Sequence, residues 1–313
     1  MAQLARARTS ALEVAYEDSG PAGALPVVLL HGYPFDVRAF DEVVPVVNSA
    51  GYRTIVPYLR GYGPTRFLSP DIPRSGEQAA LGQDLLDLLD ALQIRNAVLA
   101  GFDWGGRSAC VVAAVWPERV HGLVSCTGYQ IQNIALAKKP VDPEQERRFW
   151  YQHYFQTERG RAGLAEMRAE LGRLLWKLWS PSWVFDDETY DRTAASFNNP
   201  DFVEVVIHSY RHRMGNAAGD PRYAALEARL ASLPKISVPT VVIHGLVDDV
   251  NPAQKSEGHS KYFTGPYQRR VFENVGHNPP QESPGAFAEA ILYLCKRKPG
   301  GERAAPMRLG LRP

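Results

Sequence analysis

Short apolar runs, each the length of a β-strand, alternate with longer stretches of helical spacing over the first part of the chain. The runs predict strands at residues 12–17, 26–30, 53–56, 97–100 and 121–126. The longer stretches predict helices at residues 37–50, 77–92 and 107–116. Strands that alternate with helices in this way predict an α/β fold with a doubly wound, mostly parallel sheet.

This alternation stops after residue 127 and resumes only near residue 239. Amphipathic helices are predicted in between, at residues 145–155, 161–179 and 200–213. Strands at 239–244 and 268–272 and helices at 252–263 and 284–295 then follow. We therefore expect a core in two parts, residues 1–127 and 233–296, an inserted helical cap over 128–232 and a flexible basic tail over 297–313.

Charge balance and cysteine content exclude several classes of function. The 313 residues carry 35 Lys and Arg against 34 Asp and Glu, so nucleic acid and anionic membranes are not expected as partners. No apolar run approaches the ~18 residues that cross a bilayer, and no apolar segment follows the charged N-terminus. Cys110, Cys126 and Cys295 form no C-x-x-C pair and lie in apolar stretches. We expect buried free thiols in a cytoplasmic protein that acts on a small molecule without metal or cofactor; a homodimer stays open.

An aspartate stands at the strand–turn–helix junction within residues 96–116. Gly101, Gly105 and Gly106 surround Asp103 and leave room for a side chain presented on a sharp turn. This is the pattern of a nucleophile elbow with aspartate in place of serine, and the following helix N-terminus favours negative charge there. The same residues also fit an ordinary helix-capping aspartate, so the motif needs partners elsewhere.

Three further loops follow predicted strands. The loop at residues 31–34 reads His-Gly-Tyr-Pro, and the backbone N–H of Tyr33 is a candidate oxyanion donor together with that of Trp104, although a simple turn fits too. Asp248 and His277 each follow a later strand, with Asp249 as the second choice of acid. Because ligands bind beyond the carboxyl ends of parallel strands, we expect these side chains to meet.

The order of Asp103, Asp248 and His277 is that of the α/β-hydrolases, and the chain resembles the epoxide hydrolases within that group. The resemblance rests on His-Gly-Tyr-Pro at 31–34, Asp-Trp-Gly-Gly at 103–106, Tyr-Gln-His-Tyr-Phe-Gln at 151–156 and Tyr-Arg at 210–211. Tyr58 departs from the aspartate often found before the Arg-Gly-x-Gly loop.

The resemblance implies a role for each matching residue. Asp103 would be the nucleophile, His277 the base oriented by Asp248, and Tyr151 and Tyr210 the acids that protonate the opened epoxide. An apolar epoxide would be bound under the aromatic-rich cap, by a group of residues that comprises Trp104, Phe35, Gln152, Phe155 and Trp150.

The chemistry of a carboxylate nucleophile supports this reading. Attack on an alkyl carbon gives an ester that water can cleave, whereas attack on an acyl group would give a high-energy anhydride. Epoxide opening releases an alkoxide, which a neutral tyrosine with a pKa of ~10 can protonate.

Two alternatives stay open. A hydrolytic dehalogenase shares the Asp-Trp elbow and could bind halide through the Trp104 indole. Two features speak against it: Tyr33 replaces the Asn of haloalkane enzymes, and Trp104 replaces the Arg of fluoroacetate enzymes. A small-molecule receptor that does not turn over is the third reading, and the complete set of Asp103, Asp248 and His277 speaks against it.

Overall fold

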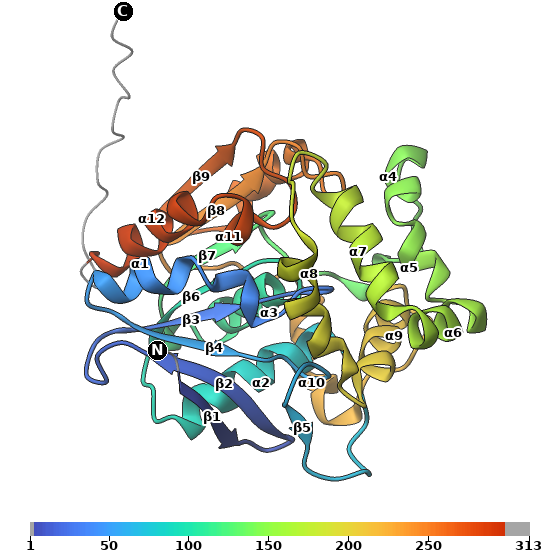
Figure 1. Ribbon diagram of the computed structural model, residues 1–313, viewed down its shortest axis with the longest axis horizontal. Helices are drawn as coiled ribbons and strands as arrows, with labels where there is room; N and C mark the ends of the chain where they lie inside the picture. The colour runs from blue at the N-terminus through green and yellow to red at the C-terminus, as the bar shows by residue number, and fades with distance from the viewer. Residues whose placement is uncertain (1–2, 298–313) are drawn as a thin grey trace, which may run out of the picture.

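Nine strands form one sheet in the part of the chain that the computed structural model describes, residues 3–297 (Figure 1). The predicted tail at 297–313 therefore lies outside the described residues except for Arg297. The strands are β1 (Gln3–Arg8), β2 (Leu12–Ser19), β3 (Pro26–Leu30), β4 (Arg53–Pro57), β5 (Arg66–Phe67), β6 (Ala97–Gly101), β7 (Val120–Cys126), β8 (Thr240–Gly245) and β9 (Tyr267–Phe272).

The sheet has the order β1-β2-β4-β3-β6-β7-β8-β9, and β5 pairs with β2. Strand β2 runs antiparallel to β1, β4 and β5, whereas the pairs from β4 to β9 are parallel. Every residue of β6 and β8 is buried, as expected for parallel strands covered by helices on both faces. The predicted doubly wound, mostly parallel sheet is confirmed.

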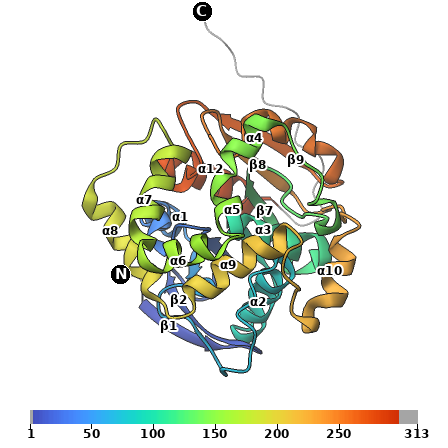
Figure 2. The same cartoon turned by 90° about the vertical axis from the view of Figure 1, so that its right-hand side faces the viewer.

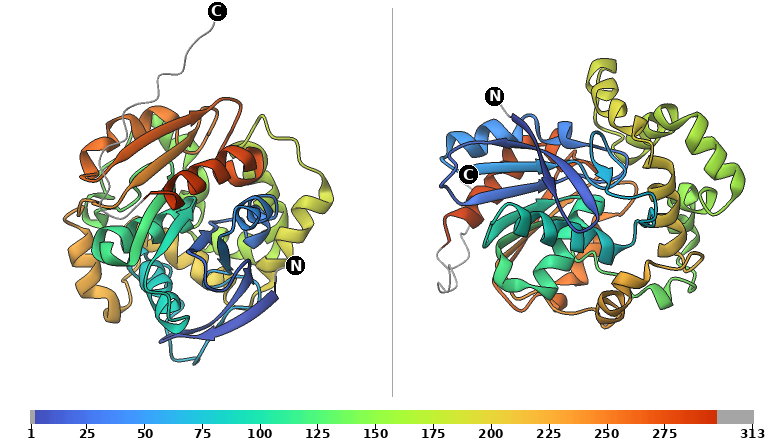
Figure 3. Two further views of the ribbon diagram at one scale, coloured as in Figure 1. Left: turned by 90° about the vertical axis from the view of Figure 1, so that its left-hand side faces the viewer. Right: turned by 90° about the horizontal axis from the view of Figure 1, so that it is seen from below.

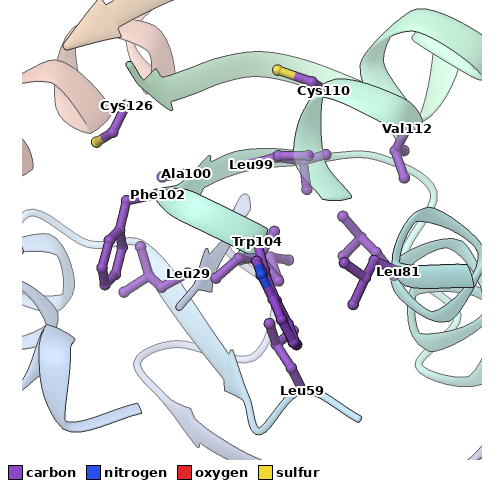
Figure 4. Close-up of a cluster of buried hydrophobic side chains, with 14 of the residues drawn as sticks. Leu29, Leu59, Leu81, Leu99, Ala100, Phe102, Trp104, Cys110, Val112 and Cys126 are labelled. Carbon is purple, nitrogen blue, oxygen red and sulfur yellow. The ribbon is translucent and has the colours of Figure 1, made fainter. Parts of the chain in front are cut away.

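Helices cover both faces of this sheet. Helices α1 (Val43–Ser49) and α12 (Pro284–Cys295) pack together on one face, and α2 (Gln78–Ala91) and α3 (Asp103–Val115) pack together on the other (Figure 3). The short helix α11 (Pro279–Glu282) leads into α12. Figure 4 shows part of the buried hydrophobic core around the central strands and α3, which includes Leu29, Leu99, Phe102 and Trp104.

A group of helices lies between β7 and β8 in the chain and gathers at one end of the sheet (Figures 1 and 2). In chain order they are α4 (Pro143–Arg148), α5 (Trp150–Tyr154), α6 (Glu158–Glu166), α7 (Arg168–Trp179), α8 (Asp187–Ala194), α9 (Phe202–Arg213) and α10 (Ala224–Leu230). Helix α10 packs against α2 of the core. We refer to α4 to α9 as the cap.

Some helix predictions were wrong in their continuity. The predicted helix at 37–50 is a short 3₁₀ turn, Val37–Phe40, followed by α1, because Pro45 lacks an N–H and is tolerated only in the first turn of a helix. The predicted helix at 145–155 breaks at Phe149, and that at 161–179 breaks at Met167. Residues 253–262 form 3₁₀ turns instead of an α-helix. Strands β1 and β5 and helices α8, α10 and α11 were not predicted.

No helix among the described residues is long and apolar enough to cross a membrane. Cys110, Cys126 and Cys295 are all buried and unpaired, which confirms the prediction of buried free thiols.

Candidate active site

Asp103 is the first residue of α3 and adopts the left-handed backbone conformation, with φ of 48°. Such a backbone is unfavourable for a residue with a side chain and marks a strained turn. Gly105 permits the turn, because a Cβ there would lie 2.1 Å from the carbonyl oxygen of Leu30 on β3. The predicted elbow therefore presents the Asp103 carboxylate at the carboxyl end of β6.

The loop after β3 lies directly against this carboxylate. A Cβ on Gly32 would lie 2.3 Å from the Cβ of Asp103, so only glycine fits there. The N–H of Tyr33 donates to Oδ1 of Asp103 at 2.8 Å, and Trp104 follows Asp103 in the first turn of α3. The backbone around Asp103 thus offers a donor to the oxygen that would carry negative charge during acyl chemistry.

His31 holds this loop from below. Its Nε2 accepts the N–H of Leu59 at 3.1 Å, and burial lowers the pKa of His31 to about 4. His31 is therefore neutral at pH 7 and serves as a fixed structural acceptor.

The acid and the histidine come together as the sequence predicted. Oδ2 of Asp248, in the loop after β8, lies 2.9 Å from Nδ1 of His277. Oδ1 of Asp248 accepts the N–H groups of Val250 at 2.8 Å and Asn251 at 2.9 Å, which fixes the carboxylate plane. Asp249, the second choice of acid, instead pairs with Arg148 at 3.0 Å.

The other ring nitrogen of His277 faces the elbow. Nε2 lies 3.6 Å from Oδ2 of Asp103 and has no hydrogen-bond partner among the described residues. Burial by itself lowers the pKa of His277, but the carboxylates of Asp248 and Asp103 outweigh it and raise this pKa to about 10. The same contact lowers the pKa of Asp103 despite the opposing effect of burial. The pair is therefore carboxylate and imidazolium at pH 7.

The cap contributes two tyrosines near the elbow. Tyr151 on α5 and Tyr210 on α9 are both buried, with ring centroids 5.4 Å apart, and the Tyr210 ring also contacts Trp104. Burial raises the pKa of both phenols, and the nearby Asp103 carboxylate adds to this. The Tyr210 hydroxyl has no hydrogen-bond partner among the described residues, whereas the Tyr151 hydroxyl accepts from Gln152 at 3.0 Å. Both phenols are neutral, so each could give a proton to a developing alkoxide.

A cavity of about 160 Å³ lies beside Asp103 and His277. Its lining joins the core and the cap, and comprises Asp103, Arg107, Thr127, Tyr129, Gln130, Gln132, Phe149, Tyr151, Gln152, Arg213, Val250, Asn251, Lys255, His259 and His277. Apart from three aromatic residues and one valine, this lining is polar or charged. This cavity therefore favours a polar or charged substrate over the apolar substrate that the sequence led us to expect.

Only one of the five predicted substrate-binding residues lines this cavity, namely Gln152. Phe35 packs behind the elbow, stacked on Trp176 at 4.8 Å and edge-on to Phe102 at 5.0 Å. Phe155 and Trp104 are fully buried in the aromatic cluster around Tyr33, and Trp150 packs on Tyr154. These four residues do not line this cavity, because the aromatic side chains here build the core between cap and sheet.

Three basic residues in the lining were not predicted, Arg107, Arg213 and Lys255. Arg107 lies one helical turn after Asp103, inside an otherwise small and apolar helix, and Arg213 lies three residues after Tyr210. The spacing of each arginine, one helical turn from a candidate catalytic residue, was the feature of the sequence that could have indicated its place in the site. Among residues 3–297, no group of three His, Cys, Asp or Glu side chains is arranged to hold a metal ion.

The sequence profile of the alpha/beta hydrolase fold family matches residues 26–284. The chain belongs to the α/β hydrolase fold family. Within it, this α/β hydrolase is epoxide hydrolase-like: it is 25% identical over 322 residues to epoxide hydrolase A of Mycobacterium tuberculosis, covering 91% of this chain and 94% of that protein.

Comparison with solved structures agrees. A candidate epoxide hydrolase from Klebsiella pneumoniae superposes on this α/β hydrolase with a TM-score of 0.92 and 45% identity, covering 94% of this chain and 98% of that one. A haloalkane dehalogenase from Psychrobacter cryohalolentis is 34% identical over 113 residues, covering 35% of this chain and 36% of that protein. The similarity to epoxide hydrolases therefore extends over nearly the whole chain.

Proposed function

We propose that the protein hydrolyses a small epoxide to a vicinal diol through an ester formed on Asp103. One observation carries this proposal. Oδ1 of Asp103 is held by the Tyr33 amide while Oδ2 faces the His277 imidazole, and the phenols of Tyr151 and Tyr210 lie buried together above the elbow. This arrangement supplies a nucleophile, a base and one proton donor, Tyr151, in the lining of one cavity, and the ring of Tyr210 lies directly beside that of Tyr151.

In the first step, Oδ2 of Asp103 attacks one ring carbon of the epoxide. The new bond joins that carbon to Oδ2, the ring C–O bond breaks, and its electron pair stays on the departing oxygen. Tyr151 or Tyr210 gives its proton to this oxygen, which becomes the hydroxyl of a hydroxyalkyl ester. The phenols are suited to this role, because their raised pKa values keep them protonated until the alkoxide forms.

In the second step, water attacks the Cγ of the Asp103 ester. Ester formation removes the negative charge beside His277, which lowers the pKa of the imidazole, so His277 can lose its proton and accept one from the water. The amides of Tyr33 and Trp104 would hold the oxyanion that forms on Oδ1. The bond between Cγ and Oδ2 then breaks, and the diol leaves with Oδ2 and one proton of the water. The other water proton restores the tyrosine hydroxyl, and the water oxygen stays in the restored Asp103 carboxylate.

A single turnover in heavy-oxygen water tests this sequence of steps. With enzyme in excess over epoxide, the label is expected in the Asp103 carboxylate, because water attacks the Asp103 carbonyl carbon. Mass spectrometry of the peptide that contains Asp103 measures it. Label found in the diol alone would mean that water attacks the epoxide directly, and would overturn the ester mechanism.

A hydrolytic dehalogenase remains the second candidate, supported by one observation. The indole N–H of Trp104 is buried and has no acceptor among the described residues, so it could bind a halide. The two buried phenols favour the epoxide, since a departing halide needs no proton. Assays of diol release from epoxides and of bromide release from matched bromoalkanes decide between the two.

We further propose that the enzyme works in the cytoplasm. Support comes from the three buried, unpaired cysteines, which fit a reducing compartment.

A further inference from the structure

Arg107 projects from α3 into the side of the catalytic cavity without an acidic partner. Its side chain lines the cavity although the residue is only 8% exposed. Nη1 donates to Oε1 of Gln132 at 2.9 Å, while Nε is enclosed and has no acceptor among the described residues. No carboxylate in residues 3–297 forms an ion pair with this guanidinium. A buried charge without a paired anion is unfavourable, so this position is costly unless a ligand completes it.

Arg213 on α9 brings a second cation to the same cavity. It is half-buried, its guanidinium lies 5.0 Å from the centre of the Tyr210 ring, and it forms no ion pair within the described part of the chain. Lys255 also lines the cavity but lies 3.6 Å from a carboxylate oxygen of Asp142. Asp103, the only acidic residue in the lining, already faces His277. The two arginines are thus left without a counter-charge.

The two guanidinium groups also disfavour each other. Burial lowers the pKa of Arg107 to about 9, and the nearby charge of Arg213 adds to this effect. Removing water from two like charges without adding an anion raises the free energy of the folded protein. A bound anion would relieve both effects, because arginine binds carboxylates through paired N–H donors.

The positions of the two arginines indicate how far a bound anion would lie from the reacting atoms. Arg107 follows Asp103 by four residues on α3, and Arg213 follows Tyr210 by three residues on α9, so each lies one turn from a proposed catalytic group. Four residues of α-helix span roughly 6 Å along the axis. An anion between the arginines would therefore lie only a few bonds from the ring carbon that Asp103 attacks.

The size of the cavity limits the rest of the substrate. Its volume of about 160 Å³ is close to the ~150 Å³ of an engineered cavity that holds benzene. A short-chain substrate fits this space, with its carbon skeleton beside Phe149 and Tyr151.

A larger groove of about 500 Å³ shares Gln132, Phe149, Gln152 and Arg213 with the cavity. Two further cations, Lys138 and Lys139, line this groove, and its one acidic residue, Glu146, pairs with His153 at 2.9 Å. The path to the cavity along this side is therefore basic, which favours the approach of an anion.

We propose that the substrate is a small epoxide that carries a carboxylate within a few bonds of the ring, bound by Arg107 and Arg213. This inference rests on the proposed epoxide hydrolysis and names the substrate class of the same site. It replaces the apolar epoxide that the sequence led us to expect.

A matched pair of substrates tests the proposal, namely 2,3-epoxybutanoate and 2,3-epoxybutanamide. The two differ in charge and are nearly equal in size. The wild-type enzyme is expected to hydrolyse the acid with a kcat/KM at least ~30-fold above that of the amide, in line with a charge-assisted hydrogen bond. In Arg107→Gln and Arg213→Gln, this acid-to-amide ratio should fall by about the same factor, mainly through KM. Arg159→Gln, at an exposed arginine on α6 that does not line the cavity, should leave the ratio unchanged.

Each outcome decides a different claim. Equal rates on acid and amide, or a preference for the amide, would overturn the anionic substrate while leaving epoxide hydrolysis intact. Activity on styrene oxide with none on the acid would do the same. Failure of all three epoxides, with chloride release from 2-chlorobutanoate, would overturn the proposed function itself. Should Arg107→Gln not fold, the wild-type ratio and the Arg213→Gln variant still decide. Competitive inhibition by butanoate with none by butanamide would support the proposal.

Discussion

Nε2 of His277 lies 3.6 Å from Oδ2 of Asp103, so the proposed base and the proposed nucleophile form a charged pair before any substrate binds. The pKa of His277 depends on this pair, since both Asp103 and Asp248 raise it. Each change in the charge of Asp103 should therefore be felt at the imidazole.

Replacing Asp103 by Asn should lower the pKa of His277, because Asn removes the charge as ester formation would. The effect on stability follows from the direction in which folding shifts the pKa of His277. His277 has a pKa of about 10 in the folded protein, and a histidine in an unfolded chain has one of about 6.5. Its contribution is thus fully present below pH 6.5 and is lost as the pH rises towards 10.

Denaturant unfolding between pH 6 and 9.5 measures this effect. The wild type should lose more stability over the interval than Asp103→Asn does, and NMR titration of the His277 ring should show the lower pKa in the variant. Parallel stability curves with an unchanged histidine pKa would mean that the two groups are not coupled.

Replacing His277 by Gln should stop the second step and leave the first. The expected result is a stable mass increase on the Asp103 peptide equal to one substrate, because Gln cannot accept a proton from the attacking water. Intact-protein mass spectrometry after mixing with epoxide detects it. Undiminished steady-state turnover by this variant would contradict the assigned role, and Asp103→Asn provides the control that cannot form an ester.

Replacing Tyr151 or Tyr210 by Phe should slow ester formation from an epoxide by an amount on the order of 10²-fold each, provided the two donors are not redundant. The double variant should be nearly inactive. Rates of the first turnover on an epoxide and on a matched bromoalkane separate proton donation from positioning, since bromide leaves without a proton. An epoxide rate that survives the loss of both hydroxyls would rule out these residues as the acids.

Replacing Arg107 by Gln should stabilise the protein in the absence of ligand, by roughly 1 kcal/mol or more, because an unpaired buried charge is removed. Denaturant unfolding at pH 7 measures the change. Arg213→Gln is the matched control and should have a smaller effect, since Arg213 is half-exposed. A clear loss of stability in Arg107→Gln would indicate that this residue has a structural role.

The sequence predicted where the residues at the ends of strands would lie. It did not predict which side chains would line the cavity between the core and the cap. Asp103, Asp248 and His277 each follow a strand of a parallel sheet, and sheet topology alone brings such positions together. Tyr151 and Tyr210 were found through short motifs in the cap sequence. Their roles remain predictions, although the structure places their rings side by side.

The chemical character of the cavity depended on packing that no local pattern reveals. Arg107 begins the predicted helix at 107–116, and whether it faces solvent or the cavity depends on how α3 packs against the loop at Gln132. Phe35 and Phe155 are aromatic and were therefore predicted to contact the ligand, yet each packs between cap and sheet. The sequence gives the type of side chain at such positions, but local patterns do not predict the direction in which that side chain points.

Gly32 and Gly105 leave no space for a side chain on the core side of the nucleophile, where an added carbon would collide with Asp103 or with β3. Substitution at these two positions is therefore excluded without a shift of the elbow itself. Changes of substrate range during evolution, or in a laboratory library, should then arise at lining positions away from the elbow, such as Phe149, Gln152 and Arg213. The elbow would then be inherited almost unchanged while the rest of the cavity lining diverges.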